Sequence, residues 1–264
     1  MTIKLVATDM DGTFLTDDKH FDQERFQKIY DYMQAHQIYF VSASCNQYYQ
    51  LKDFFKAFPK VLFVAENGAL IATHQEILAT YTFTPELVQK VLNVLQQMPA
   101  IQPIVCAKES AYVLDDVPLD FYRYSSFYFP HIKKVAKLAD IDDQVFKFSV
   151  RCPELETDDY LKKLAKAIGP EVSVVSSGQG DIDIIRVDIN KATGLQYLSQ
   201  KLNISPEQMC AFGDGGNDLE MLSFVGSGVA MKNAPTIVKE TAPFQTSDNN
   251  QQGVLKYLEA QFNL

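Results

Sequence analysis

The sequence has little clustered positive charge and no long apolar run. Its 264 residues include 24 Lys and Arg against 33 Asp and Glu, which gives a net charge of -9 at pH 7. Because no Lys/Arg-rich run is present, nucleic acid is not expected as a partner. No apolar stretch is long enough to cross a bilayer, and the N-terminus lacks the basic and apolar segments of a secretion signal. We therefore expect a cytoplasmic protein that does not bind membranes.

Cysteine and histidine are also scarce and scattered. The four cysteines occur without C-x-x-C spacing, and the four histidines show no metal-ligand pairing. A zinc site or a disulfide framework is therefore not expected. Three of the cysteines lie in apolar runs, where we expect small core residues. A histidine-based catalyst is not expected either.

Two carboxylates stand at the end of the first hydrophobic run. Residues 3–8 predict a short buried strand, and Asp9 and Asp11 follow it in the motif Asp-Met-Asp-Gly-Thr. Because side chains alternate along an extended chain, both carboxylates point the same way, and Gly12 lets the backbone turn sharply. Two like charges this close are unfavourable unless something neutralises them, and a divalent cation does so best. The motif therefore predicts a metal site.

The same motif could also belong to a solvated acidic loop or to an EF-hand calcium loop. A solvated acidic loop stays open on this motif alone, since D-x-D-x-T arises by chance in about one chain in thirty of this length. An EF-hand calcium loop requires Gly at its sixth position and Glu at its twelfth. This chain has Phe14 and His20 at those positions. The calcium loop is therefore excluded. A second acidic site elsewhere in the chain would favour the metal site over the solvated loop.

A second acidic motif lies near the C-terminal end of the chain. Asp214 and Asp218 occur in Gly-Asp-Gly-Gly-Asn-Asp, between an apolar run at 209–212 and the start of a helix at 219–222. The glycines allow close backbone approach, and N–H groups at a helix start favour an anion. No Gly-Lys-Ser/Thr follows, so this is not a Walker A loop. The motif is expected by chance in about one of several hundred chains, so coincidence of both motifs is implausible.

Strands and helices alternate in the first and last thirds of the chain. Apolar runs at 38–41 and 61–65 predict strands, and amphipathic patterns predict helices at 21–37, 46–58 and 191–202. Strands separated by helices imply parallel β-α-β units. We therefore expect an α/β fold with a doubly wound, mostly parallel, Rossmann-like core.

The middle of the chain follows a different pattern. Between residues 83 and 186, five candidate strands surround three candidate helices. The second of these helices is expected at about 118–139, with a break at Pro130. This pattern predicts an α+β cap at 83–186, inserted into a core that is formed by 1–82 and 187–264.

The two acidic motifs, their order and the insertion between them resemble the haloacid dehalogenase superfamily of phosphatases. Within it the chain resembles the Cof-type group with a large α+β cap, and the resemblance covers essentially its whole length. Several longer strings are similar to the bacterial sugar phosphatases of this group; they lie at 42–51, 176–183, 191–194 and 248–250. The short acidic motifs are specific for the superfamily, and the longer strings support the subgroup.

The resemblance implies a role for each acidic residue. Asp9 would be the nucleophile that forms an aspartyl-phosphate, and Asp11 would be the general acid and then the general base. Mg²⁺ would bridge Asp9, Asp214 and the backbone carbonyl of Asp11. Asp218 would bind the metal directly or through water, hold Lys191, or only cap the following helix. Lys191 is predicted to be catalytic and to contact phosphate or Asp9.

One loop departs from the family pattern. Many Cof-type members have Ala-Thr-Gly-Arg after the second strand, and this chain has Ala43-Ser44-Cys45-Asn46. Ser44 keeps the hydroxyl that is expected to bind a phosphate oxygen, whereas Asn46 replaces a charged, bidentate arginine. Cys45 replaces a flexible glycine and is also interpreted as a buried small residue. Ser44, Cys45 and Asn46 are predicted to bind phosphate, together with Asn217.

These features predict a Mg²⁺-dependent phosphatase for small phosphomonoesters, with sugar phosphates as the expected substrates. The cap would close over the core and exclude water, and its aromatic segment at 121–129 would contact a sugar ring or fill the cap's own core. Two alternatives remain. One is a phosphomutase of the same superfamily; the other is a non-catalytic phosphosugar-binding regulator, which the intact Asp11 disfavours. The expected partner is a small phosphorylated metabolite, and the expected state is a monomer or small homo-oligomer.

Overall fold

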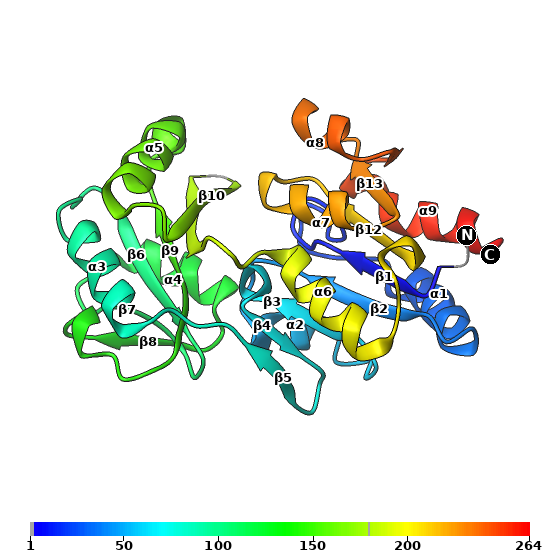
Figure 1. Cartoon of the computed structure of the whole chain (residues 1–264), viewed down its shortest axis with the longest axis horizontal. Helices are drawn as coiled ribbons and strands as arrows, with labels where there is room; N and C mark the ends of the chain where they lie inside the picture. Colours follow the sequence, from blue (N-terminus) through cyan, green and yellow to red (C-terminus); the bar gives the residue numbers. More distant parts are fainter. Residues whose placement is uncertain (1–2, 179) are drawn as a thin grey trace.

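The strands form two separate sheets. The computed structural model describes residues 3–178 and 180–264, and Figure 1 shows the two sheets side by side, with both termini at the end of the core far from the second sheet. The core sheet has eight strands in the order β14-β13-β12-β1-β2-β3-β4-β5. Its strands are β1 Leu5–Thr8, β2 Tyr39–Ala43, β3 Leu62–Ala65, β4 Leu70–Ala72, β5 Ile77–Thr80, β12 Met209–Gly213, β13 Ser227–Met231 and β14 Phe244–Thr246.

The core sheet is mostly parallel. All pairs from β14 through β3 are parallel, and only β4 and β5 pair antiparallel at one edge. This confirms the expected α/β fold with a doubly wound core. The edge hairpin β4–β5 was not predicted, because its strands are short and β5 is only partly buried, so neither leaves a clear alternation of apolar and polar residues.

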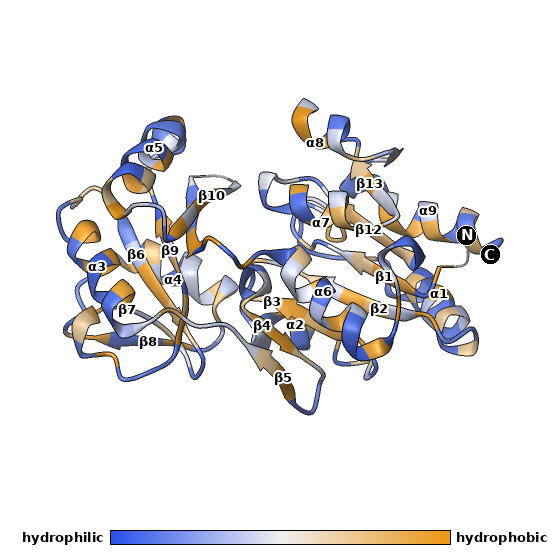
Figure 2. Cartoon of the chain, viewed as in Figure 1, coloured by the Kyte–Doolittle hydropathy of each residue, from blue (hydrophilic) through white to orange (hydrophobic). Residues whose placement is uncertain are grey.

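Helices cover both faces of the core sheet. The helices are α1 Gln23–Ala35, α2 Tyr48–Phe54, α6 Lys191–Leu202, α7 Leu219–Phe224, α8 Thr236–Thr241 and α9 Gly253–Phe262. Because side chains alternate along a strand, Val6 of β1 packs in the cluster with α1, α2 and α9, whereas Leu5 and Ala7 pack in the cluster with α6, α7 and α8. Figure 2 shows hydrophobic colours along the strands and mixed colours on the outer helices.

The inserted segment forms the second sheet, in the order β10-β11-β9-β6-β7-β8. Its strands are β6 Gln102–Ala107, β7 Ala111–Leu114, β8 Ile132–Val135, β9 Val145–Arg151, β10 Val172–Gly178 and β11 Asp181–Arg186, and its helices are α3 Pro85–Leu95, α4 Leu119–Tyr128 and α5 Thr157–Ile168. Short 3₁₀ helices lie at Glu66–Gly68, Leu138–Asp140, Glu154–Glu156, Pro206–Gln208, Gly216–Asp218 and Asn249–Gln251. The exact domain boundaries stay a prediction.

The prediction of a long helix at about 118–139 was wrong. Helix α4 ends at Tyr128, and β8 follows and pairs parallel with β7. Pro130 cannot continue a helix and disfavours helical backbone at Phe129, so the chain is already extended when it reaches Ile132. Among the described residues, no helix is both long and apolar enough to cross a bilayer.

The second sheet and its helices, called the cap below, contact the loop that follows β2 and the helix α2. The amide of Gln47 donates to the His131 carbonyl at 2.9 Å, and its oxygen accepts from the His131 N–H at 2.9 Å. The Gln50 amide donates to the Phe127 carbonyl at 2.6 Å. The rings of Tyr49 and His131 stack with centroids 3.6 Å apart. The cap therefore lies against the loop that carries Cys45 and Asn46.

Candidate active site

The first acidic loop leaves the sheet at the end of β1. Thr8 pairs with Phe212 in the parallel ladder of β1 and β12, and the Asp9 N–H donates to the Phe212 carbonyl at 3.0 Å. Gly12 has φ +79°, and a Cβ at this position would collide with the carboxylate of Asp214. Only glycine avoids both problems. The two acidic loops are therefore in direct contact, as expected for neighbouring parallel strands.

Three carboxylates meet at this edge of the sheet. One carboxylate oxygen from each of Asp9, Asp214 and Asp218 lies within 4.8 Å of the others. The Thr13 hydroxyl donates to Asp214 Oδ1 at 2.6 Å, and the Asn233 amide donates to Asp214 Oδ2 at 3.3 Å. Asp9 and Asp218 are buried and Asp214 is partly buried, and such a compact set of carboxylate oxygens has the donor chemistry that Mg²⁺ prefers. These residues fit a magnesium ion, and metal binding by each of them stays a prediction.

Lys191 lies at the first position of α6 and is fully buried. Its Nζ donates to Asp9 Oδ1 and to Asp218 Oδ1, both at 2.6 Å. Of the two contacts predicted for Lys191, the structure shows the one with Asp9. Asp218 Oδ2 accepts from the N–H groups of Asp214 and Gly215, both at 2.9 Å. Asp218 thus holds Lys191 and the acidic loop, and it makes no capping bond to α7.

The buried charges in this cluster do not balance. Burial raises the pKa of Asp9 well above its ordinary value, although Lys191 acts in the opposite direction. Burial and the charge of Asp218 raise the pKa of Asp214 to about 7. Burial alone would lower the pKa of Lys191, but Asp218 and Asp9 outweigh it and raise that pKa. Lys191 bonds two of the three carboxylates, and a divalent cation would complete the charge balance of the cluster.

The side chain of Asp11 is bonded to residues outside the group of three carboxylates. Its Oδ1 accepts from Lys19, and its Oδ2 accepts from the Asn46 amide at 2.7 Å. Lys19 also lies 5.6 Å from the ring centroid of Tyr128 in the cap. The metal contact expected for the backbone carbonyl of Asp11 stays a prediction. Lys19 was missed, because an isolated lysine in an acidic loop gives no sequence signal.

The predicted phosphate-binding loop follows β2. Ser44 is fully buried, and its Oγ accepts from the Asn46 N–H at 3.1 Å. Burial raises the pKa of the Cys45 thiol, so this side chain stays neutral. Asn46 is 6% exposed and directs its amide to Asp11 rather than into solvent. The amide of Asn217 donates to Asn67 Oδ1 at 3.3 Å. Phosphate binding by Ser44, Cys45, Asn46, Asn217 and Lys191 stays a prediction.

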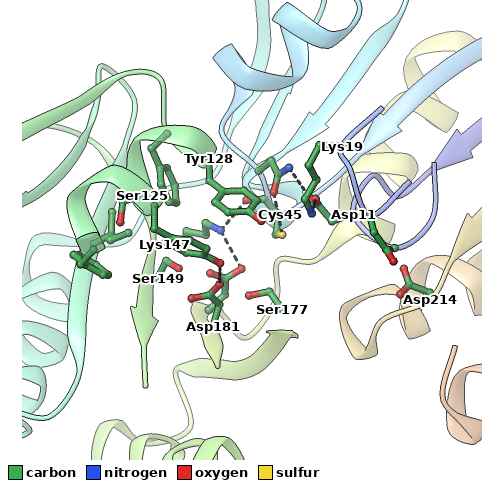
Figure 3. A pocket seen from close by; sticks show the side chains of 18 of the residues that line it. Asp11, Lys19, Cys45, Ser125, Tyr128, Lys147, Ser149, Ser177, Asp181 and Asp214 are labelled. Carbon is green, nitrogen blue, oxygen red and sulfur yellow. Dashed lines mark hydrogen bonds and ion pairs between the residues drawn. The ribbon is translucent and has the colours of Figure 1, made fainter. Parts of the chain in front are cut away.

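Two adjoining cavities open on this site, both lined by Asp11, Cys45, Ser177 and Asp214. The first, about 450 Å³, lies over Asp9 and the acidic loop of Asp214. The second, about 350 Å³, extends between core and cap, as Figure 3 shows, and is called the cap-side cavity below. A phosphoryl group at Asp9 would therefore place its leaving group toward the cap.

A buried ion-pair network connects the cap to the core. Lys147 of β9 donates to the Cys45 carbonyl at 2.7 Å and to Asp183 Oδ2 at 3.0 Å. Asp183 Oδ2 also accepts from the Asn67 amide at 2.7 Å. Burial raises the pKa of nearby Glu66 to about 8. These residues were missed, although a lone charge inside each apolar run, at Lys147 and at Asp183, was a usable signal.

Comparisons with known proteins agree with this geometry. A family model described as haloacid dehalogenase-like hydrolase matches residues 6–258, and the chain belongs to this family. The relative 5-amino-6-(5-phospho-D-ribitylamino)uracil phosphatase YbjI of Escherichia coli (strain K12) is 36% identical over 260 residues, which cover 98% of this chain and 96% of that protein. YitU of Bacillus subtilis (strain 168), named with the same activity, is 46% identical over 83 residues, 31% of each protein.

A solved structure extends this similarity to the whole fold. SMU.1108c from Streptococcus mutans UA159 matches with a TM-score of 0.94 at 32% identity, and the match covers 100% of both chains. The family and the named relatives agree on the class of reaction. The chain is therefore a phosphoric monoester hydrolase of the haloacid dehalogenase type.

Proposed function

We propose that this phosphatase is Mg²⁺-dependent, that it uses Asp9 as its nucleophile, and that it acts on phosphomonoesters of sugars or sugar alcohols. The observation that carries this proposal is the group formed by Asp9, Asp214, Asp218 and Lys191, beside a cavity lined by residues of both core and cap. Phosphoryl transfer depends mainly on positioning and charge stabilisation, and this group supplies both.

Each step is assigned to a residue of this chain. An oxygen of Asp9 attacks phosphorus, the bond from phosphorus to the leaving oxygen breaks, and Asp11 gives that oxygen a proton. Water then attacks the phosphorus of the aspartyl-phosphate while Asp11 takes its proton, so that phosphate leaves and Asp9 is restored. Lys191 holds Asp9 in place throughout. Magnesium, bound at Asp9 and Asp214, would neutralise negative charge on the transferred group.

The relatives suggest the first substrate to try. YbjI and YitU are named for the phosphate ester of a ribityl chain attached to a uracil, and a ribityl chain is a sugar alcohol. We propose 5-amino-6-(5-phospho-D-ribitylamino)uracil and simple sugar phosphates as candidate substrates of this chain. The proposed ligand is thus a small phosphorylated metabolite. A cytoplasmic location and a monomeric or small oligomeric state stay predictions.

The test is phosphate release from a panel of these compounds with Mg²⁺, with and without EDTA. Wild type is expected to release phosphate from at least one member, and Asp9→Asn and the EDTA-treated enzyme are expected to release almost none. Isomeric sugar phosphate without free phosphate would indicate the mutase alternative. If wild type released no more phosphate than Asp9→Asn on any compound, the proposal would be wrong.

A further inference from the structure

Asn67 forms hydrogen bonds with three separate parts of the molecule. Its side-chain amide donates to Asp183 Oδ2 in the cap at 2.7 Å, and its side-chain oxygen accepts from the Asn217 amide at 3.3 Å. Its backbone N–H donates to the Ser44 carbonyl at 3.0 Å. Asn67 is buried, so bulk water does not compete for these bonds. One residue therefore connects the cap, the second acidic motif and the predicted phosphate-binding loop.

The backbone at Asn67 has a conformation that few side chains tolerate. Glu66, Asn67 and Gly68 have φ of +51°, +56° and +97° in the 3₁₀ turn that follows β3. Asparagine adopts this left-handed backbone more readily than most residues other than glycine. A Cβ at Gly68 would collide with the carbonyl of Asn190, the residue before Lys191. This unfavourable turn thus packs tightly against the start of the helix that carries Lys191, and such backbone collects at functional sites.

The charged partner of Asn67 belongs to an ion pair within the cap sheet. Asp183 of β11 lies opposite Ser149 of β9, so Lys147, two residues before Ser149, is a diagonal neighbour of Asp183 on the same face. Lys147 Nζ is 3.0 Å from Asp183 Oδ2. Both side chains are buried and line the cap-side cavity. The two charges therefore offset each other within the cap.

Two hydrogen bonds cross from this ion pair to the core. Lys147 donates to the Cys45 carbonyl at 2.7 Å, and Asp183 accepts from the Asn67 amide at 2.7 Å; Figure 3 shows Lys147 reaching from the cap toward Cys45. Both of these core groups are uncharged, and burial raises the pKa of the adjacent Glu66 to about 8, so that it is mostly neutral at pH 7. Movement of the cap would therefore leave Lys147 and Asp183 paired with each other, without an uncompensated charge.

From these contacts we propose that Asn67 is a positioning residue that couples docking of the cap to the alignment of Asn217, which lines the cavity over Asp9. With the cap docked, the bond to Asp183 fixes the rotation of the planar Asn67 amide, so that its oxygen faces Asn217. When the cap moves away, the amide loses its charged acceptor and no longer fixes Asn217. This inference rests on the proposed phosphatase function and on the predicted phosphate contact of Asn217.

The first test exchanges the two partners across the interface. Asn67→Asp places two carboxylates against each other and should lower kcat/KM for phenyl phosphate by about tenfold or more. Adding Asp183→Asn restores one donor and one acceptor and leaves one carboxylate near Lys147, so the double variant should recover to within about threefold of wild type. Asn93→Asp, an exposed residue of α3, is the control for the charge change and should match wild type. A loss in Asn67→Asp no larger than in the control, or no recovery in the double variant, would overturn the inference.

A double-mutant cycle with Asn217 separates positioning from a purely structural role. Asn67→Gly tolerates the left-handed backbone and removes only the amide, so it also decides the question if Asn67→Asp does not fold. It should lower kcat/KM by about tenfold in the wild-type background, but by less than about twofold in the Asn217→Ala background, where the residue that it positions is already truncated. Equal losses in the two backgrounds would show that Asn67 acts only on the fold.

Hydrogen exchange measured by mass spectrometry tests the coupling without turnover. Peptides covering residues 44–51, which contact the cap, and residues 214–218 should exchange faster in Asn67→Asp than in wild type, and at the wild-type rate in the double variant. If wild type hydrolyses no phosphomonoester but exchange changes in this way, the contact stands, whereas the proposed function fails and the positioning role fails with it. If wild type is active and exchange in Asn67→Asp is unchanged, the proposed function stands and this inference is wrong.

Discussion

Asn46 donates its side-chain amide to Asp11 at 2.7 Å, across the gap between the loops that follow β1 and β2. The Cof-type pattern that this loop resembles has arginine at the position of Asn46, and this chain has a neutral donor there. With Lys19 on the other oxygen, both oxygens of the Asp11 carboxylate are bonded, and Asp11 lines both cavities of the site. The residue that we propose as the general acid is thus bonded by two residues outside the acidic motifs.

Asn46→Ala should reduce kcat by about tenfold, because Asp11 loses a charge-assisted hydrogen bond that fixes its orientation. Steady-state kinetics with the best substrate of the panel would measure the change. Asn93→Ala, an exposed amide in α3, is the matched control and should keep the wild-type kcat. If Asn46→Ala raised KM alone and left kcat unchanged, Asn46 would bind substrate instead of positioning Asp11.

Lys191→Met should destabilise the fold as well as remove activity. The substitution leaves the carboxylates of Asp9 and Asp218 buried without their shared cation, and loss of one partner of a buried ion pair costs about 3–5 kcal/mol. Urea unfolding would measure the free energy of unfolding. Adding Asp218→Asn to Lys191→Met should recover part of this stability, because one unpaired charge is removed. A loss below about 1 kcal/mol in the single variant would contradict the ion-pair account.

Magnesium affinity should fall as the solution becomes acidic. Burial and the neighbouring Asp218 raise the pKa of Asp214 to about 7, and a cation binds the ionised carboxylate, so protons compete below that pH. The dissociation constant for Mg²⁺ should increase by about tenfold for each pH unit below 7. Isothermal titration calorimetry at pH 8 and pH 6 would measure it, and Asp214→Asn should abolish binding. Equal affinity at the two pH values would contradict the raised pKa of Asp214, and undiminished binding in Asp214→Asn would show that Asp214 is not a ligand.

Glu66 should make the fold less stable at higher pH. Burial raises its pKa from an ordinary 4.5 to about 8, so the folded chain keeps a proton that the unfolded chain releases. The protonated Glu66 side chain contributes fully to the free energy of unfolding below about pH 4.5. This contribution is lost as the pH rises through about 8. Relative to wild type, Glu66→Gln should therefore gain stability between pH 5 and pH 8 in thermal unfolding. The exposed Glu240→Gln is the control, and a pH-independent difference for Glu66→Gln would contradict the shifted pKa.

Much of the core could be predicted from the sequence. The acidic motifs end buried strands, and the carboxyl ends of parallel neighbours meet at one edge of a sheet, which brings Asp9 and Asp214 together. Lys191 was found through the family resemblance, together with the fact that a lysine at a helix start is locally unfavourable. These features depend on local sequence and on a general rule of parallel sheets.

The cap contacts could not be predicted in the same way. The bonds of Lys147 with Cys45 and Asp183 depend on the register of β9 against β11 and on the position of the cap. Side-chain alternation fixes the face of a strand but not its register against a distant neighbour. Strand β8 was missed because Pro130 was interpreted as a break within a helix rather than as its end.

The most direct test of the account is whether the phosphoryl group passes through Asp9. The enzyme would be mixed with its best substrate and Mg²⁺, quenched with acid within the first turnover and digested, and the peptides would be analysed by mass spectrometry. The account predicts a phosphoryl group on the peptide that contains Asp9 and none in Asp9→Asn. Phosphate release at the full rate with no phosphoryl group on Asp9, or with the group on another residue, would contradict the account.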